Sequence, residues 1–525
     1  MSGLKTTPVH QLVTAAQMRA LEQDAFGGGG LTGADLMEAA GRAVAAAVLA
    51  HWPDLARTPK RAVVYCGPGN NGGDGFVVAR HLAGWGWRVD VAYLGSVARM
   101  PPDARRNHDL WAAQGPIRAL DQVDPGAADV IVDALFGIGL TRPLPEIVDQ
   151  TLCQAARMTG PRPRIVAVDV PSGLCADSGR VLGGMAVRAD LTVSFHRAKL
   201  GHVLADGPAH CGALVVADIG LRGDGGGVAL VAPPSPAVID KAHPTGQGLH
   251  KYDHGHALIL SGPMGRSGAA RLAARAALRV GAGLVTVAAP GSAMLENACQ
   301  LTAIMLRRLG SATELASMLA QDPRLNAICL GPGLGVGPGA RDLVAAALAQ
   351  PERAVVLDAD ALSGFADAPQ DLFDLTHANT VLTPHGGEFA RLFPDLAAML
   401  AGQPAHGPAA SRVDAARAAA ARAGCIVLLK GADTVLAAPD GRVAVHAAIG
   451  PRAVPWLATA GAGDVLAGLI TGLMARGRDA FTACTAAIWL HVEAARIIGP
   501  GLIAEDIPEA LPRVLRDVLT PPLAR

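Results

Sequence analysis

The sequence predicts an α/β protein made of two tandem doubly wound domains, in which helices cover both faces of a parallel sheet. Short apolar runs alternate with alanine-rich amphipathic stretches along the chain. The length of 525 residues exceeds what one ordinary hydrophobic core holds. A stretch rich in Gly and Pro, residues 220–245, interrupts the alternation. We therefore expect one domain over residues 1–224 and a second over residues 225–525.

The first half begins with a predicted helix and continues with strand-like runs. Thr14 and Gln17 have the spacing of a capping box, which favours a helix that begins after Thr14. Each later apolar run is followed by glycine, proline or an amphipathic segment, which is the rhythm of βαβ units. The runs predicted as strands are residues 61–66, 87–94, 129–136, 164–170, 191–195 and 213–220.

The second half resumes this rhythm after the boundary, although no internal sequence repeat relates the two halves. The apolar runs are again short and rich in Val, Ile and Leu, as expected for strands buried on both faces. The runs predicted as strands are residues 256–262, 284–290, 327–333, 354–360, 380–384, 425–431 and 442–446.

Charge and composition limit the partners. There are 45 Lys and Arg against 45 Asp and Glu, with no basic stripe, so we expect neither nucleic acid nor a membrane as a partner. The apolar segments are shorter than the roughly 20 residues that span a bilayer, and the N-terminus does not resemble a signal peptide. The eight cysteines include no C-x-x-C pair and are expected to be reduced, mostly buried thiols. These features predict a cytoplasmic protein.

The stretch "YCGPGNNGGDGF", residues 65–76, contains glycines at 67, 69 and 72 in the pattern G-x-G-x-x-G, and Asp90 follows about twenty residues later. This pattern predicts a dinucleotide-binding turn. However, a pyrophosphate needs bare backbone N–H groups, whereas Asn70, Asn71 and Asp74 stand in this turn. The ligand must therefore tolerate a carboxylate, and we expect Asp74 to cap or orient the turn.

Two further strand ends carry oxygen-bearing side chains beside glycine, Asp133 in one and Asp169 with Ser172 in the other. Each residue alone is compatible with capping the next helix. Three such ends on one sheet favour a shared site, because ligands bind beyond the carboxyl ends of parallel strands. Asn71, Asp133 and Ser172 offer oxygen without His or Cys, which suits a hard, weakly held monovalent cation and disfavours zinc.

The segments "GPGNNGGDG", "DALFGIGL" and "VDVPSG", with "LVTAAQM" and "LMEAAG" upstream, resemble the NAD(P)H-hydrate epimerase family over roughly residues 10–220. The resemblance implies a Rossmann-like fold, K⁺ held by Asn71, Asp133 and Ser172, and a proton-handling Asp169. One departure is Ile138, where the family usually has Thr. The implied substrate contacts are Asn70, Asn71, Gly72, Gly73, Asp74, Gly137, Ile138, Gly139, Leu140, Thr141, Arg142, Pro143 and Asp169.

In the second half, "TAGAGDVLAG" is the most informative strand end. Gly461, Ala462 and Gly463 precede an apolar run typical of a helix, so their N–H groups can face an anion while Asp464 projects from the first turn. Phosphoryl transfer to a hydroxyl requires such an anion hole and a carboxylate that accepts the hydroxyl proton. The same residues are compatible with a tight turn and an N-cap, but "KGADT" some thirty residues earlier favours the functional interpretation.

The segments "GPGLG", "TPHGGEF", "KGADT" and "TAGAGDVLAG" resemble ADP-dependent NAD(P)H-hydrate dehydratases, a ribokinase-like family, over roughly residues 235–520. By this resemblance ADP donates a phosphoryl group, Mg²⁺ is expected, and Asp464 is catalytic. Ala462 departs from the Thr or Ser common in the turn. Implied nucleotide contacts are Lys430, Gly431, Ala432, Asp433, Thr434 and Gly463. Implied substrate contacts are Ala269, Gly333, His385 and Asp464.

The two resemblances together predict a bifunctional enzyme that repairs hydrated NADH and NADPH. The first domain would interconvert the R and S forms, and the second would dehydrate the S form with ADP. An alternative is a ribokinase-like kinase of a small vitamin alcohol fused to a non-catalytic nucleotide-binding module. In either case we expect small-molecule substrates and a homo-oligomer.

Overall fold

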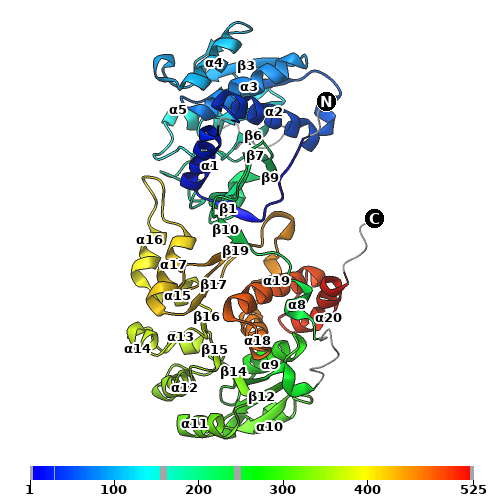
Figure 1. The fold of residues 1–525 in the computed structure, drawn as a ribbon, viewed down its shortest axis with the longest axis vertical. Helices are drawn as coiled ribbons and strands as arrows, with labels where there is room; N and C mark the ends of the chain where they lie inside the picture. Colours follow the sequence, from blue (N-terminus) through cyan, green and yellow to red (C-terminus); the bar gives the residue numbers. More distant parts are fainter. Residues whose placement is uncertain (1–3, 29, 154–161, 242–249, 521–525) are drawn as a thin grey trace. The chain divides into compact units, whose positions relative to one another are not determined.

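The computed structural model describes residues 4–28, 30–153, 162–241 and 250–520. The chain divides into two compact units (Figure 1). The first unit consists of Met1–Leu230 with Gly402–Arg412, and the second of Val231–Ala401 with Val413–Arg525. Both units are α/β structures with mostly parallel sheets, so the predicted fold class is confirmed.

The main sheet of the first unit has the strand order β4-β3-β2-β5-β6-β7-β9, and all its pairs are parallel. The chain runs outward from β2 in one direction and from β5 in the other, so the order reverses between them. Ligand sites in such sheets lie at this point. The strands are β2 (Arg61–Cys66), β3 (Arg88–Tyr93), β4 (Ile117–Arg118), β5 (Val130–Ala134), β6 (Arg164–Val168), β7 (Leu191–Phe195) and β9 (Ala213–Ala217).

One face of this sheet packs against helices in an apolar core, and the capping box predicted at Thr14 is present at the start of the first of these helices. Gly41 allows close packing of two helices, because a Cβ there would lie 2.4 Å from Val77 Cβ. The helices of the first unit are α1 (Ala15–Gly27), α2 (Gly33–His51), α3 (Asn70–Gly84), α4 (Pro102–Ala112), α5 (Glu146–Val148) and α7 (Gly207–Cys211). Three short strands, β1 (Gln11–Val13), β8 (Ala198–Lys199) and β10 (Val228–Leu230), pair separately from the main sheet.

The other face of the first sheet is covered partly by a segment from late in the chain. Ala409 is buried among the apolar side chains of this face, including Leu140 and Leu182. The backbone N–H of Gly407 donates to Thr141 O at 3.0 Å. The sequence pattern did not predict that residues 402–412 belong to the first unit.

The second unit has the strand order β13-β12-β11-β14-β15-β16-β17-β18-β19. The pairs are parallel from β13 to β17, whereas β18 and β19 are antiparallel additions. The sequence pattern did not predict β13 or β18. The strands are β11 (His256–Leu260), β12 (Leu284–Ala289), β13 (Met305–Arg308), β14 (Leu325–Leu330), β15 (Ala354–Leu357), β16 (Thr380–Leu382), β17 (Ile426–Leu429), β18 (Asp433–Ala437) and β19 (Val443–Ala447).

Helices lie on both faces of this sheet, with α9 and α18 on one and α12 and α15 on the other (Figure 1). Gly468 lets α18 approach α9, because a Cβ there would lie 2.1 Å from Ala273 O. The helices are α8 (Pro236–Ile239), α9 (Gly268–Arg279), α10 (Met294–Ala298), α11 (Ala312–Gln321), α12 (Pro338–Leu348), α13 (Asp360–Ser363), α14 (Pro369–Phe373), α15 (Gly386–Leu392), α16 (Pro394–Ala401), α17 (Arg412–Ala423), α18 (Ala462–Ala475), α19 (Ala480–Ile498) and α20 (Asp506–Leu519).

Among the described helices, α19 alone is long and apolar enough to cross a membrane by length and composition. Its most apolar window is 61% buried inside the second unit, where it packs in the core with α18 and α20. A buried core helix passes the same test, so this helix is weak evidence for a membrane span. The seven cysteines whose side chains are described form no disulfide, and of these only Cys299 is exposed.

Candidate active sites

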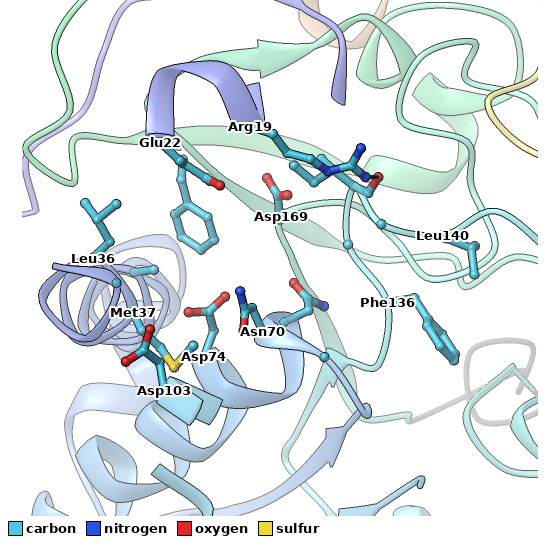
Figure 2. A pocket seen from close by; sticks show the side chains of 18 of the residues that line it. Arg19, Glu22, Leu36, Met37, Asn70, Asp74, Asp103, Phe136, Leu140 and Asp169 are labelled. Atoms are coloured by element: carbon cyan, nitrogen blue, oxygen red, sulfur yellow. Dashed lines mark hydrogen bonds between the residues drawn. The ribbon is translucent and has the colours of Figure 1, made fainter. Parts of the chain in front are cut away.

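The first unit has a cavity of about 730 Å³ beyond the ends of β2 and β5, where the strand order reverses (Figure 2). This volume is in the range of small-molecule sites. Its wall combines the glycine-rich turn, the loop after β5, the end of β6, and residues of α1 and α2. The predicted site residues that line it are Asn70, Asn71, Asp74, Gly137, Ile138, Gly139, Leu140, Thr141, Arg142 and Asp169.

The glycine-rich turn lies directly against the loop after β5. A Cβ at Gly67 would lie only 1.7 Å from Leu135 O, so no side chain fits there. Helix α3 then begins at Asn70, and its N-cap Gly69 provides no side-chain cap. Asp74 lies in the second turn of this helix, so the expectation that it caps the turn is wrong. Its side chain instead lines the cavity.

Three residues predicted to contact substrate are outside the described cavity wall. Gly72 and Gly73 are buried packing positions of α3, where a Cβ would lie 2.0 Å from Gly67 O and 2.5 Å from Met37 Sδ, respectively. Pro143 packs against Gly183. Their contacts with substrate stay a prediction.

Asp133 and Ser172 form a fully buried polar pair under the cavity floor. Ser172 Oγ donates to Asp133 Oδ1 at 2.6 Å, and Ser172 N donates to Asp133 Oδ2 at 2.8 Å. The hydroxyl also accepts from Phe136 N at 2.9 Å. Burial raises the pKa of Asp133 to about 6, although the hydrogen bonds from Ser172 oppose this rise. No cationic side chain among the described residues is paired with this carboxylate.

Asn71 lies at the same edge of the sheet. Its Oδ1 is 2.8 Å from the position that a Cβ of Gly137 would occupy. Its Nδ2 is buried and has no hydrogen-bond partner among the described residues. The side-chain amide therefore faces the loop after β5, where a ligand can complete its hydrogen bonds. The three predicted K⁺ ligands thus lie on three strand ends that meet beside the cavity.

Asp169 is held by a network of buried groups. Its Oδ1 accepts from Lys199 Nζ at 2.6 Å and from Ser194 Oγ at 2.9 Å. Its carbonyl oxygen accepts from His202 Nε2 at 2.8 Å. Its φ of 65° is in the left-handed region, which is unusual for a residue other than glycine. The sequence analysis missed Lys199, although a lysine four residues beyond the strand-like run "LTVSF", within "AKLGHV", is a signal that could have indicated it.

Helix α1 adds two charged residues that the sequence analysis also missed. Arg19 donates to Ile138 O at 3.1 Å, which ties the helix to the loop after β5. Glu22 lines the cavity opposite Asp169 (Figure 2). Burial and the charge of Asp169 raise the pKa of Glu22. Burial and the charges of Asp169 and Glu22 raise the pKa of Asp74 well above its ordinary value.

In the second unit, α18 begins with the predicted turn. Gly461 is its N-cap with φ of 90°, and Asp464 projects from the first helical turn, as the sequence predicts. His491 Nε2 donates to Ala462 O at 2.9 Å and holds this turn in place. The first N–H groups of the helix have no side-chain cap, so they can bind an anion.

A lysine–carboxylate pair lies beside this helix start. Lys430 Nζ donates to Asp358 Oδ1 at 2.6 Å, and Thr383 Oγ1 donates to the same oxygen at 2.9 Å. A Cβ at Gly463 would lie 3.4 Å from Lys430 Nζ. The ends of β15, β16 and β17, which carry Asp358, Thr383 and Lys430, therefore meet at the start of α18. Burial and the nearby Asp358 raise the pKa of Asp464 to about 7. Asp358 lies in the predicted strand at residues 354–360 but was not predicted as a site residue.

The other predicted residues of the second unit lie on the segments that follow β11, β14, β16 and β17. His385 is the N-cap of α15, and its Nδ1 accepts from Gly387 N at 2.9 Å. Gly333 packs against the loop after β11, where a Cβ would lie 2.4 Å from Arg266 O, and Ala269 follows in the first turn of α9. The segment Lys430, Gly431, Ala432, Asp433 and Thr434 joins β17 to β18, with Thr434 Oγ1 donating to Gly431 O at 2.6 Å.

Comparisons with known proteins identify the family of this chain. Residues 33–201 match the YjeF-related protein N-terminus family, and residues 257–511 match the NAD(P)H-hydrate dehydratase family. A "Bifunctional NAD(P)H-hydrate repair enzyme Nnr" of Moorella thermoacetica is 36% identical over 97% of each chain. The chain belongs to the family of bifunctional NAD(P)H-hydrate repair enzymes. Another family member, from Salinibacter ruber, is 36% identical over 96% of each chain.

Solved structures similar to this chain include an ADP/ATP-dependent NAD(P)H-hydrate dehydratase from Bacillus subtilis co-crystallized with ATP/Mg²⁺. It is 27% identical, covers 55% of this chain and 100% of its own, and superposes with a TM-score of 0.45. The family resemblance predicted from the sequence is confirmed by the full-length relatives. The same relatives favour the repair enzyme over the alternative of a vitamin kinase fused to a binding module.

Proposed function

We propose that this chain repairs hydrated NADH and NADPH in two steps, one in each unit. The first unit interconverts the R and S forms at C6 of the hydrated nicotinamide ring. The second unit converts the S form back to NAD(P)H with ADP. The observation that carries this proposal is the convergence of Asn70, Asn71, Asp74 and Asp169 on one cavity, in a chain with full-length relatives named for this repair.

The chemistry explains why two units are needed. Water added across C5–C6 leaves a hydroxyl on C6, next to the ring nitrogen N1. Hydroxide is a poor leaving group, since the pKa of water is about 15.7, whereas the second pKa of phosphate is about 6. Phosphorylation of the hydroxyl therefore lets N1 expel phosphate, with loss of a C5 proton. A site that phosphorylates one stereoisomer needs a partner that supplies it from the other.

In the first unit, we assign substrate binding to Asn70, Asn71, Asp74, Asp169 and the loop from Gly137 to Arg142. Gly67 lets this turn come close enough to the loop for both to contact one ligand. Asp169 presents Oδ2 toward the cavity, because Oδ1 is occupied by Lys199 and Ser194. This free carboxylate oxygen suits the role of proton acceptor.

Asp133, Ser172 and Asn71 fit a K⁺ ion. A buried carboxylate without a cationic side-chain partner, next to hydroxyl, amide and backbone oxygens, is a donor set for a hard cation of low charge. When bound, the ion would supply positive charge that ties the three loops together.

In the second unit, ADP and Mg²⁺ would bind at the start of α18 and the segment Lys430–Thr434. The N–H groups of the helix start would hold the transferred phosphoryl group. The oxygen of the C6 hydroxyl would attack the β-phosphorus of ADP, and AMP would leave. Asp464 would accept the proton of this hydroxyl during the attack. His385, Gly333 and Ala269, on neighbouring strand ends, would contact the hydrated substrate.

The test is an assay of the purified chain on a mixture of NADH-hydrate epimers with ADP and K⁺. We expect the wild type to restore the dihydronicotinamide absorbance of the whole mixture. The Asp169→Asn variant should restore the S portion alone, and the Asp464→Asn variant should restore none while still equilibrating the epimers. A wild type that phosphorylates a small vitamin alcohol and leaves the hydrates unchanged would overturn the proposal in favour of the kinase.

We further propose a cytoplasmic enzyme that acts on these small molecules and not on nucleic acid or membranes, and that forms a homo-oligomer. The balance of 45 basic and 45 acidic residues supports the absence of nucleic acid as a partner. Light scattering of the purified chain would test the homo-oligomer, and a single-chain mass would exclude it.

A further inference from the structure

Lys199 is a buried lysine whose hydrogen-bonding capacity is fully used inside the protein. Its side chain is 0% exposed. Nζ donates to Asp169 Oδ1 at 2.6 Å, to Ser194 Oγ at 2.9 Å and to Phe195 O at 3.3 Å. An ammonium group has three protons, so none is left for a ligand. A buried ammonium is costly unless it is paired, and Lys199 therefore acts through its partner Asp169.

The same lysine also fixes the backbone of Asp169. The backbone N–H of Lys199 donates to His202 Nδ1 at 3.0 Å, and His202 Nε2 donates to the carbonyl oxygen of Asp169 at 2.8 Å. Burial and the charge of Lys199 lower the pKa of His202 to about 4, which keeps the ring neutral so that one nitrogen accepts and the other donates. Asp169 is thus held at both its carbonyl and its Oδ1, in the left-handed conformation that a β-carbon disfavours.

Asp169 differs in this respect from the other carboxyl groups of the cavity. Glu22 and Asp74 line the same cavity (Figure 2), yet neither has an ion-pair partner among the described residues. Burial and the charge of Asp169 raise the pKa of both groups. One lysine-paired carboxylate beside two carboxyl groups whose pKa is raised is the arrangement needed for a base and an acid in one site.

We propose that Lys199 is the positioning residue of the epimerase site, which holds Asp169 as the ionised carboxylate with Oδ2 aimed at the C6 hydroxyl. This inference rests on the epimerase function proposed above. Lys199 would thus act in the reaction without touching the substrate. Ser194 would contribute less, through its hydrogen bond to Asp169 Oδ1.

The reaction that this arrangement supports is opening and closing of the hydrated ring. Asp169 Oδ2 takes the proton of the C6 hydroxyl, the O–H electrons form a C=O bond, and the C6–N1 bond breaks. Its electrons go to N1, which takes a proton from a protonated carboxyl group of the cavity. Rotation about C5–C6 and the reverse steps close the ring on the other face. No oxidant, reductant or second substrate is needed.

The test compares pH–rate profiles of epimerisation in the full-length chain. Lys199→Met keeps the length of the side chain and removes its charge. We expect a loss of about 100-fold at neutral pH, with part of the rate recovered at higher pH as the acidic limb of the profile moves up by about one pH unit or more. KM should change by less than about threefold, because Lys199 does not touch the substrate. The charged and titratable groups that face Asp169 in this experiment are Lys199, His202, Glu22, Arg19 and Asp74.

Ser194→Ala keeps the proposal testable if Lys199→Met does not fold. It removes one hydrogen bond to Oδ1, so we expect a loss of several-fold in kcat and a smaller shift in the same direction. Thr192→Ala is the matched control, since Thr192 is equally buried on β7 but its hydroxyl donates to Cys211 O at 2.7 Å and not to Asp169. Its pH profile should keep the wild-type shape.

The outcomes separate the inference from the function on which it rests. If the ratio of variant to wild-type rate is the same at every pH, or if KM alone rises, Lys199 is only structural and the inference is overturned. If Lys199→Met keeps the wild-type rate, the inference is also overturned. If the wild type does not interconvert the epimers, the proposed function itself fails.

Discussion

The two units each place a lysine beside an aspartate at the end of a strand, but they connect this pair to the site differently. In the first unit Lys199 is paired with Asp169, the carboxylate that lines the cavity, at 2.6 Å. In the second unit Lys430 is paired at 2.6 Å with Asp358, a neighbour of the predicted base Asp464. By the proposal above, the first lysine would act directly on the base of its unit, whereas the second would act on the surroundings of the predicted base.

The difference has a consequence for proton transfer. Asp464 is half-buried near Asp358 without a direct cationic partner among the described residues, and partial burial together with the charge of Asp358 raises its pKa to about 7. A carboxylate with a pKa near the working pH is a better proton acceptor than one with an ordinary pKa. Asp169 instead has a direct ion-pair partner in Lys199, and burial and the charge of Asp169 raise the pKa of its neighbours Glu22 and Asp74. A lysine–aspartate pair can thus support a proposed base in two ways. The base is itself the paired carboxylate, as in Lys199–Asp169, or it lies next to the pair, as Asp464 lies next to Lys430–Asp358.

The change with the largest expected effect removes the base of the second unit. Asp464→Asn keeps the size of the side chain but cannot accept a proton, so we expect ADP-driven dehydration to fall by about 10³-fold or more. Epimerisation should stay within about twofold of wild type, because it belongs to the other unit. Absorbance recovery measures the first activity, and chromatographic separation of the epimers measures the second. Loss of epimerisation in this variant would show that the activities are assigned to the wrong units.

The next change removes the buried charge under the first cavity. Asp133→Ala should lose ion binding and about 100-fold in epimerase rate, because Asp133 is the only full negative charge among the three predicted K⁺ ligands. The measurement is epimerase rate against K⁺ concentration, with Na⁺ and Mg²⁺ in place of K⁺ as controls.

Dehydration of the S form by the same Asp133→Ala protein should continue, which shows that the second unit is folded. Wild-type epimerisation that does not depend on K⁺ would contradict the assignment of the ion. Full epimerase activity in the variant would contradict it as well.

Replacing Lys430 in the second unit should have a smaller effect, which is measured as a change in the pH dependence of dehydratase kcat/KM. We propose the Asp464 carboxylate as the active form, and with a pKa of about 7 its fraction would increase as pH rises through neutrality. Dehydratase kcat/KM should therefore rise with pH and level off above about pH 8. Lys430 lowers the pKa of Asp464, so in Lys430→Ala the rise should move to higher pH.

Lys430→Ala should also raise the KM for ADP about tenfold, because a charge-assisted contact to phosphate is lost. Arg442→Ala is the control for loss of positive charge, since Arg442 pairs with Asp440 on the surface at 2.7 Å. An unchanged KM for ADP together with an unchanged pH profile would move the nucleotide site away from Lys430.

Much of this comparison follows from the sequence. The strands at residues 61–66 and 191–195 were predicted with the bounds that the structure has, because Val-rich runs between Gly, Pro and Asp leave little choice of boundary. The position of Asp169 directly after a strand and that of Asp464 at the start of a helix also follow from the local sequence pattern. The lysine partners do not, because Lys199 reaches Asp169 across 30 positions and Lys430 reaches Asp358 across 72.

Other features depended on contacts that no local pattern carries. Residues 402–412 join the first unit because Ala409 fills its core, which is a property of the assembled fold and not of the segment. The short strands β13 and β18 lack a long apolar run, so their pairing depends on neighbouring strands. Asp74 was expected to cap or orient the turn, but it does not cap it, because Gly69 is the N-cap and α3 begins earlier than the run of glycines suggests.

The smallest expected effect tests whether the two units are independent in stability. Thr14 caps α1, the helix that carries Arg19 and Glu22, with Gln17 N donating to Thr14 Oγ1 at 3.2 Å. Thr14→Ala should lower the free energy of unfolding of the first unit by about 1 kcal/mol. Ser311→Ala is the matched change in the second unit, because Ser311 caps α11 by accepting from Glu314 N at 3.2 Å. Calorimetry measures the unfolding temperatures, and the loss of each activity on heating assigns them to the units. Thr14→Ala should lower the unfolding temperature of the epimerase unit, and Ser311→Ala should lower that of the dehydratase unit. If either change lowers both transitions equally, the two units unfold as one, and the comparison between them holds for their sites but not for their stability.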